Sequence, residues 1–196
     1  MGLGVTGSAP VPARVFEGRR TWRLTPDAFT AAARLIAGAE AAHRPQAVVG
    51  IARGGTQLAE WVAAHLSVPA VVIGARHNTT DAPRASASGR VRLDAVPEAA
   101  LAVLGRGRRL LVVDDVVGSG ATLRAVLADL AARVAPVGVR TAVLCRNAGT
   151  RFAPDTWGWE VADWVVFPWE APPPSAEPLP ALTRLHHRTG PPVRDI

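Results

Sequence analysis

Two adjacent acidic residues stand at the end of an apolar run and are followed by a turn of small residues. The segment reads LLVVDDVVGSGAT over residues 110–122, with the acids at Asp114 and Asp115. A glycine-rich turn that opens a helix leaves backbone N–H groups free, and the positive end of the helix dipole favours an anion there. Ser119 and Thr122 add hydroxyl donors. The segment therefore predicts a site for one phosphate.

The two acids would repel that phosphate unless they bind something else. Vicinal hydroxyls of a sugar, or a hydrated magnesium ion, are natural partners for such a carboxylate pair. An ordinary strand–turn–helix with acids as caps is the alternative, but two acids at a buried strand end argue against it. The residue types favour a phosphorylated sugar as ligand.

Short apolar runs alternate with helical patterns around this segment. Thr25 can cap a helix with Pro26 at its first position, and apolar residues recur at helical spacing up to Ala37. The patterns predict strands at 46–52, 68–74, 108–116, 137–145 and 161–170, and further helices at 58–66 and 121–134. This alternation predicts an α/β fold, a single-domain open parallel twisted sheet with helices on both faces. Ligands of such sheets bind at the carboxyl ends of the strands, where the acids lie.

Three stretches do not follow the alternation. Residues 1–20 are rich in Gly, Pro and Ala and predict a loose N-terminal arm, whereas residues 171–196 predict a proline-rich tail. The domain itself is expected to cover residues 21–170. Residues 75–98 have no sustained periodicity, and a loop of that length in a compact domain is typical of a functional lid or of disorder.

The composition favours a small anionic ligand. All 22 basic residues are arginine and the net charge is +6, and the planar guanidinium suits phosphate and carboxylate groups. Nucleic acid is the competing partner, but the arginines are scattered rather than gathered in a tract. No apolar run reaches the ~18–20 residues that span a bilayer, and no secretory signal is evident. A single cysteine, Cys145, excludes an internal disulfide. We expect a cytoplasmic protein without a membrane partner.

The segment at 110–122 resembles the motif by which type I phosphoribosyltransferases bind 5-phosphoribosyl 1-diphosphate (PRPP). Its order of apolar, acidic and small positions is specific, whereas a lone GxG would be weak. The resemblance implies that Asp114 and Asp115 hold the ribose hydroxyls directly or through Mg²⁺, while the following turn cradles the 5-phosphate. The residues that it assigns to PRPP in this motif are Asp114, Asp115, Val117, Gly118, Ser119, Gly120, Ala121 and Thr122.

Two further segments stand in the same family order. VVGIARGGTQLA (48–59) looks like the pyrophosphate loop of the family, which often carries a non-proline cis peptide; a plain Gly-Gly turn is the alternative. The resemblance implies that this loop offers backbone amides to the diphosphate, and that Arg53 joins the two acids as a catalytic residue. The loop residues are Ala52, Arg53, Gly54 and Gly55. The lid lies where the family has its catalytic loop, and its candidates for contacting pyrophosphate are Arg76, His77 and Arg84. His77 is equally well explained as a solvated loop histidine.

The run DWVVFPWE (163–170) resembles the hood that covers the acceptor in bacterial xanthine–guanine phosphoribosyltransferases and related archaeal purine enzymes. Trp164 and Val165 match the Trp-Ile/Val pair that packs on the base, and Glu170 ends the matching Pro-Trp-acid sequence. A tryptophan here could instead plug the edge of the core. The acceptor-binding candidates are Arg146, Trp164, Val165 and Glu170.

Two positions depart from the family pattern. Gly118 stands where 6-oxopurine enzymes have an aspartate that handles the ring-nitrogen proton of the base, and glycine can do no acid–base chemistry. The family also places a lysine after the fourth strand to hold the exocyclic oxygen, whereas this chain has Arg146 or Asn147 in that region. Donor binding is therefore better supported than the identity of the acceptor.

The resemblance implies a PRPP-dependent phosphoribosyltransferase with Mg²⁺ as cofactor. It would move the phosphoribosyl group to a nucleobase-like acceptor of the purine, xanthine/guanine type and release pyrophosphate, and family analogy implies a homo-oligomer. An alternative acceptor is an amine or hydroxyl of a specialised metabolite such as an aminoglycoside-type sugar. Glu160, Asp163 and Glu170 would suit a cationic acceptor of that kind. A PRPP-sensing nucleic-acid-binding regulator is a further alternative, although the ~45 residues before the first strand lack room for a helix-turn-helix module.

Overall fold

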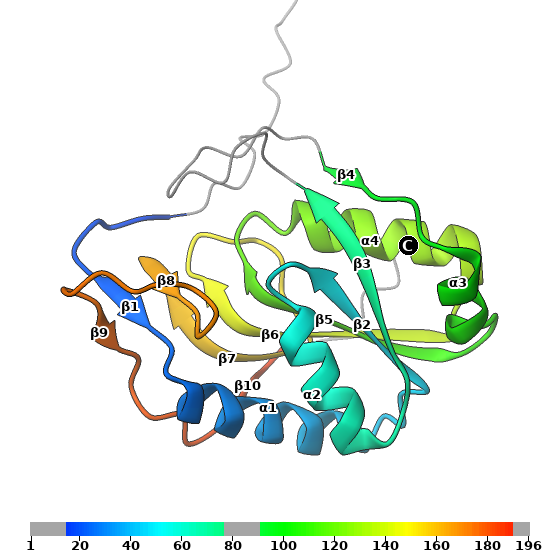
Figure 1. Ribbon diagram of the computed structural model, residues 1–196, viewed down its shortest axis with the longest axis horizontal. Coiled ribbons are helices and arrows are strands. Elements are labelled where there is room, and N and C mark those ends of the chain that lie inside the picture. Colours follow the sequence, from blue (N-terminus) through cyan, green and yellow to red (C-terminus); the bar gives the residue numbers. More distant parts are fainter. Residues whose placement is uncertain (1–14, 77–90, 190–196) are drawn as a thin grey trace, which may run out of the picture.

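A central sheet of seven strands organises the part of the chain that the computed structural model describes, residues 15–76 and 91–189 (Figure 1). Its strand order is β10-β7-β6-β5-β2-β3-β4, and the five inner strands run parallel. The short edge strands β4 and β10 pair antiparallel to their neighbours. The strands are β2 (Ala47–Ala52), β3 (Ala70–Arg76), β4 (Arg92–Leu93), β5 (Arg109–Val117), β6 (Gly138–Asn147), β7 (Thr156–Val161) and β10 (His186–His187).

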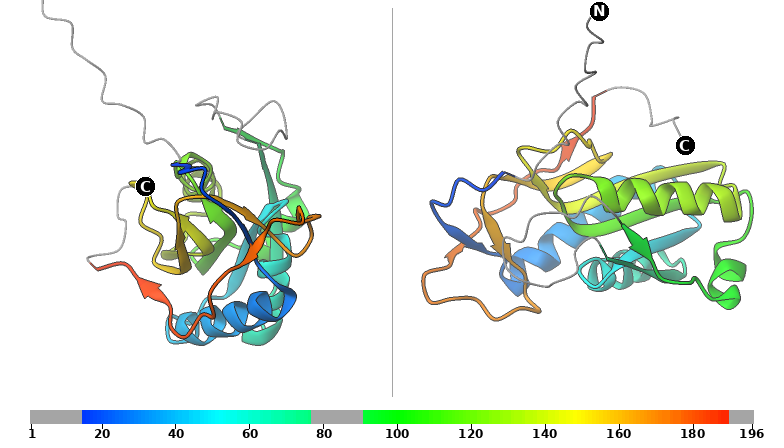
Figure 2. Two further views of the ribbon diagram at one scale, coloured as in Figure 1. Left: turned by 90° about the vertical axis from the view of Figure 1, so that its left-hand side faces the viewer. Right: turned by 90° about the horizontal axis from the view of Figure 1, so that it is seen from above.

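Helices cover both faces of this sheet, as Figure 2 shows from above and from the side. One core contains buried residues of α1 (Pro26–Ala41) and α2 (Thr56–Leu66). The other contains buried residues of α3 (Glu98–Leu104) and α4 (Ala121–Val134). The predicted α/β fold with a parallel sheet between helices is therefore confirmed. No helix in the described part of the chain combines the length and apolar character that a membrane crossing requires.

The predicted start of the first helix is confirmed in detail. Pro26 opens α1, and the Thr25 hydroxyl oxygen accepts a hydrogen bond from the Ala28 N–H at 3.2 Å. The cap satisfies one of the N–H groups that the first turn leaves without a partner inside the helix. The buried positions of α1 include Phe29 and Ile36, so its apolar face packs on the sheet as the spacing predicts.

A second, smaller sheet was not predicted. It has the order β8-β1-β9 and consists of β8 (Trp164–Val166), β1 (Thr21–Arg23) and β9 (Glu177–Pro178), all parallel. We call it the hood sheet. The predicted strand at 161–170 is wrong, because the chain bends at residues 162–163 and divides that run between two sheets. Asp163 is buried at the bend and accepts a hydrogen bond from the Gly18 N–H, so a polar contact rather than sheet pairing fixes this position.

Both segments that the sequence set apart from the domain pack on it where they are described. Before β1, the Glu17 N–H donates to the Ala162 carbonyl at 2.8 Å. After β9, the Trp159 indole N–H donates to the Pro180 carbonyl at 2.9 Å, and β10 then pairs with β7. In Figure 1 the chain runs from β9, beside the N-terminal end of α1, to β10 at the far edge of the large sheet.

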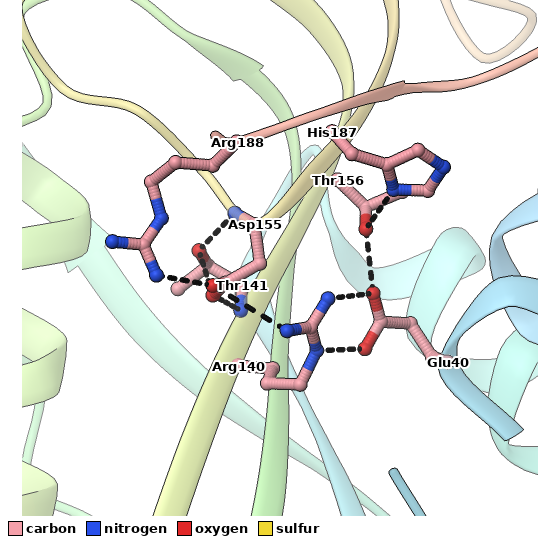
Figure 3. Close-up of polar contacts among 7 residues, drawn as sticks. All are labelled: Glu40, Arg140, Thr141, Asp155, Thr156, His187 and Arg188. Atoms are coloured by element: carbon pink, nitrogen blue, oxygen red, sulfur yellow. Dashed lines mark hydrogen bonds and ion pairs between the residues drawn. The ribbon is translucent and has the colours of Figure 1, made fainter. Parts of the chain in front are cut away.

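At the amino ends of strands β6 and β7 lies a polar network around the buried acids Glu40 and Asp155, which Figure 3 shows. The Arg140 guanidinium donates to both carboxylate oxygens of Glu40, at 2.6 and 3.1 Å. Asp155 accepts from Thr141 and from Arg188, the latter at 2.7 Å. We call this set the basal network, and it consists of Glu40, Arg140, Thr141, Asp155, Thr156, His187 and Arg188. It joins α1, β6, β7 and the C-terminal segment.

Candidate active site

The two predicted anion-binding turns lie side by side because their strands are paired. Gly50 of β2 is the partner of Val113 of β5, so the loops after both strands leave the sheet at the same edge. A Cβ atom at Gly54 would lie 1.9 Å from Oδ2 of Asp115. The Asp115 carboxylate therefore packs directly on the backbone of the first loop, where only glycine leaves room for it.

The first loop has the backbone features that the resemblance implied. The peptide bond between Ala52 and Arg53 is cis. A Cβ atom at Gly55 would lie 2.6 Å from the Val113 carbonyl oxygen, so this glycine is also required by a close backbone approach. The Gly55 N–H donates to the Ile51 carbonyl at 2.8 Å, while the Arg53 side chain is exposed. The loop thus holds its backbone tightly and directs its one charged residue to solvent.

The acid pair consists of a buried carboxyl group, Asp114, and a half-buried one, Asp115. Asp114 is 9% exposed, and its Oδ1 accepts a hydrogen bond from the Asp115 N–H at 3.0 Å. Oδ1 of Asp115 in turn accepts from the Val116 N–H at 2.6 Å. Burial, and then the neighbouring charge of Asp115, raise the pKa of Asp114 well above its ordinary value. Hydroxyl donors or a cation bound here would stabilise the ionised pair.

The second loop is supported from behind by residues that the sequence did not indicate. Gly120 has a φ of +79°, and a Cβ atom there would lie 2.3 Å from Cβ of Phe152. The Arg124 guanidinium lies 5.6 Å from the Phe152 ring centroid and donates to the Ser119 carbonyl at 2.7 Å. Phe152 stands in an irregular loop between β6 and β7, so no local periodicity marks it. These contacts shape the turn that opens α4.

The predicted acceptor residues are placed differently from one another. Trp164 is half-buried and stacks on Phe16, with ring centroids 5.9 Å apart. Val165 is 2% exposed and belongs to the core of the α1 face. The Glu170 carboxylate accepts from the Phe167 N–H at 2.8 Å and so closes the turn after β8. Of these three residues, Trp164 is the one with an aromatic ring, and that ring is half-buried.

The fourth acceptor candidate, Arg146, is engaged with the loop after β6 and with β7. Its guanidinium donates to the Thr150 carbonyl at 2.9 Å and to Glu160 at 3.1 Å, and it lies 5.4 Å from the Trp157 ring centroid. Its assignment to the acceptor stays a prediction. The next residue, Asn147, is completely buried and binds the backbone of Val15.

The lid is described only at its start and end. Arg76 is exposed at the end of β3, where it pairs with Arg92 of β4. His77 and Arg84 lie outside the described residues. Among the residues that are described, no group of three or more His, Cys, Asp and Glu side chains could hold a metal ion.

Comparison with known proteins extends the local resemblance to most of the chain. The sequence matches the phosphoribosyl transferase domain family over residues 25–176. No curated relative matches the chain in sequence. Purine phosphoribosyltransferase from Pyrococcus horikoshii superposes with a TM-score of 0.65 at 24% identity, covering 78% of this chain and 96% of that one.

Two further solved structures share the fold at low identity. Xanthine-guanine-hypoxanthine phosphoribosyltransferase from Helicobacter pylori gives a TM-score of 0.63 at 23% identity, covering 77% of this chain and 94% of the other. A hypoxanthine phosphoribosyltransferase from Staphylococcus aureus gives 0.56 at 13% identity, with 71% and 76% covered. At such identities the structures show the fold, while the sequence match shows the family and with it the transferase class. The chain therefore belongs to the phosphoribosyl transferase domain family, as LLVVDDVVGSGAT and the Arg-Gly-Gly turn predicted.

Proposed function

We propose that the protein transfers the 5-phosphoribosyl group of PRPP to a purine-type acceptor and releases pyrophosphate. The observation that carries the proposal is the contact between the two motifs, in which the Asp115 carboxylate packs on Gly54. One carboxylate pair thereby stands between two glycine turns, and PRPP has a sugar diol between two anionic groups. The family match and the purine enzymes that share the fold support the same substrate class.

Each part of PRPP has residues suited to it. The turn from Gly118 to Thr122 and the start of α4 offer backbone N–H groups to the 5-phosphate. The Asp114 and Asp115 carboxylates accept hydrogen bonds from the ribose hydroxyls. Arg53 and the amides of its loop other than that of Gly55, which donates to the Ile51 carbonyl, hold the diphosphate. The acceptor nitrogen then attacks the anomeric carbon with inversion, the bond to the diphosphate oxygen breaks, and pyrophosphate leaves with that electron pair.

Magnesium fits this donor set. Mg²⁺ usually keeps several waters and binds proteins through one or two carboxylates together with substrate phosphates, and two adjacent carboxylates beside the proposed diphosphate site meet that description. Asp114 and Asp115 would hold the ion through water. When bound, Mg²⁺ neutralises charge that develops on the leaving pyrophosphate. Family analogy also implies a homo-oligomer.

The acidic residues near the hood favour a purine over a cationic acceptor. Three acids would suit an amino sugar, but each has an internal partner: Glu160 with Arg146, Asp163 with the Gly18 N–H and Glu170 with the Phe167 N–H. Against the purine stands Gly118, which offers no carboxylate to the ring-nitrogen proton. An amine or hydroxyl of a specialised metabolite is therefore the second candidate. A neutral amine attacks without a base at that position, whereas a hydroxyl needs another group to take its proton.

Pyrophosphate release tests the proposal. The protein is incubated with PRPP and Mg²⁺ together with xanthine, guanine, hypoxanthine, adenine or an aminoglycoside, and the product is identified by mass spectrometry. We expect a nucleoside monophosphate and stoichiometric pyrophosphate with at least one purine. A product formed only with the aminoglycoside would replace the first candidate by the second. Silence across the whole panel would contradict both.

Two glycine variants show whether such turnover comes from the proposed site. Gly54→Ala places a Cβ atom against the Asp115 carboxylate, so we expect turnover to fall steeply. Gly38→Ala is the matched control, because a Cβ atom there meets nothing within 4 Å. Equal turnover in the two variants would show that the reaction does not use the contact between the motifs.

A further inference from the structure

A short segment before β1 is held at the end of β6 and at the bend before β8, and it precedes the part of the chain that matches the family. We call residues 15–18 the N-terminal clamp, whereas the family match begins at residue 25. The Val15 N–H donates to Oδ1 of Asn147 and the Val15 carbonyl accepts from Nδ2, both at 2.8 Å. The Gly18 N–H donates to Oδ1 of Asp163 at 2.6 Å. Asn147 and Asp163 are both buried, so the clamp is anchored at two places in the interior.

The clamp lies at the carboxyl edge of the sheet, beside the phosphate loop. Arg146 of β6 is the partner of Val117 of β5, so Asn147 lies level with Gly118, where that loop begins. Asn147 is also the partner of Val161 at the end of β7. The first anchor of the clamp therefore borders the donor site, and the second lies next to Trp164 at the start of β8.

Between its anchors the clamp places an aromatic ring on the hood tryptophan. The Phe16 and Trp164 rings are stacked, with centroids 5.9 Å apart and an angle of 30° between their planes. A flat acceptor between two rings would need them about 7 Å apart, twice the ~3.5 Å contact distance of carbon atoms. Phe16 therefore covers one face of Trp164, and an acceptor at the hood meets the pair of rings rather than entering between them.

The anchors hold the clamp too firmly for an acceptor to displace it cheaply. Release would take hydrogen bonds from a completely buried amide and from a carboxylate that is 5% exposed, and buried polar groups without partners are costly. The Asn147 amide and the Asp163 carboxylate therefore form these hydrogen bonds with the backbone of the clamp and not with an acceptor. Any selection among acceptors by their shape then falls to the rings of Phe16 and Trp164.

We propose that Phe16 is a specificity-determining residue, which forms an apolar wall of the acceptor site together with Trp164 and limits the size of the acceptor. This inference rests on the proposed transfer to a purine-type acceptor. It makes the N-terminal clamp part of the active site, although the clamp lies outside the family domain.

Steady-state kinetics of Phe16→Ala test the wall. We expect KM for the purine to rise about tenfold, the scale of a lost aromatic contact, while KM for PRPP stays unchanged. The preference for guanine over the bulkier N2-methylguanine should narrow, because space opens beside Trp164. Phe16→Leu should restore part of the wild-type preference. Leu35→Ala is the matched control, since it removes an apolar side chain that is exposed on α1, outside the clamp.

The outcomes separate the wall from the function on which it rests. If the wild-type protein turns over a purine and Phe16→Ala keeps the same acceptor KM and the same preference, Phe16 is no wall and the transferase function stands. A lower melting temperature without a kinetic change would assign the clamp a structural role and overturn the inference. If the wild-type protein releases no pyrophosphate with any acceptor, the proposed function is wrong, and so is the role of Phe16 that depends on it.

Discussion

The two ends of the parallel strands, which we call the amino edge and the carboxyl edge of the sheet, surround buried carboxyl groups with opposite kinds of neighbour. At the amino edge, Glu40 is 1% exposed and both of its oxygens accept hydrogen bonds from Arg140. At the carboxyl edge, Asp114 is 9% exposed and its neighbour is another acid, Asp115, whose charge raises the pKa of Asp114 further above the level set by burial. Burial of a charge costs free energy at either edge. At the amino edge the Arg140 guanidinium offsets this cost. At the carboxyl edge the Asp114 carboxyl group can keep its proton, or a bound ligand can stabilise its charge.

This difference separates stability from function within one sheet. The basal network joins α1, β6, β7 and the C-terminal segment, so its ion pairs connect parts that are distant in sequence. At the other edge, the Asp115 carboxylate of the acid pair packs on the neighbouring glycine loop. Removing a negative charge from the basal network should therefore lower the stability of the protein. Removing the charges of the acid pair should instead lower its activity.

The largest effect is expected from Glu40→Gln. The substitution leaves the Arg140 guanidinium without its main counter-charge and weakens the hydrogen bond that the Thr156 hydroxyl donates to Glu40. Breaking a buried ion pair by removing one partner costs about 3–5 kcal/mol, and the lower end applies here because the Arg140 side chain is 27% exposed and also pairs with Asp155. We expect a loss of that size in the free energy of unfolding measured in urea, and an unchanged KM for PRPP at temperatures where the variant is folded. A raised KM with unchanged stability would reverse the assignment of this edge.

The next effect is the loss of activity in Asp114→Asn/Asp115→Asn. Two amides cannot accept the ribose hydroxyls as carboxylates do, nor attract a cation, so we expect kcat/KM to fall by about 10²–10³-fold, the cost of losing a preorganised electrostatic contact. The double variant should unfold at no lower temperature than the wild-type protein, because it removes a buried acid together with the neighbouring acid whose charge disfavours its ionisation. Near-normal turnover would show that the acid pair is not part of the site.

The acid edge was predictable from the sequence, whereas the basal network was not. Asp114 and Asp115 stand next to each other between an apolar strand and a glycine turn, so one local pattern carries both their placement and their chemistry. Glu40 and Arg140 are one hundred positions apart in sequence. Glu40 lies near the end of a helical pattern, where polar residues are common, and no feature of the neighbouring sequence indicates that it is buried against an arginine of β6.

The same limit explains what was missed at the hood. The run at 161–170 is apolar enough for one strand, but a buried hydrogen bond from Gly18 to Asp163 bends it and creates two. Strands β1, β9 and β10 have only two or three residues, too few for periodicity to indicate them. Their pairing partners lie far away in sequence, so only the folded chain shows that residues 15–18 pack beside Trp164.

The stability of the protein should depend on pH through Asp114 of the acid pair. Because the pKa of Asp114 is raised in the folded protein, the folded state holds this proton to higher pH than the unfolded state does. The resulting stabilisation is complete below the ordinary pKa of 3.8 and is lost as pH rises through the raised value. Asp114→Asn cannot ionise, so its melting temperature relative to wild type should increase from pH 4 upward. A difference that stays constant with pH would mean that Asp114 titrates alike in both states.

The smallest effect is expected for Asp129→Asn, which sharpens the role of burial. Arg133 donates to both Asp129 oxygens at 2.8 and 2.9 Å, distances close to those between Arg140 and Glu40. The Arg133 side chain is 45% exposed, however, and this pair lies one helical turn apart on α4. Exposed pairs at that spacing contribute about 0.3–0.5 kcal/mol, so the urea midpoint should hardly move and salt should remove the difference. If Asp129→Asn cost as much as Glu40→Gln, hydrogen-bond geometry rather than burial would set the strength of these pairs, and the contrast between the two edges would lose its physical basis.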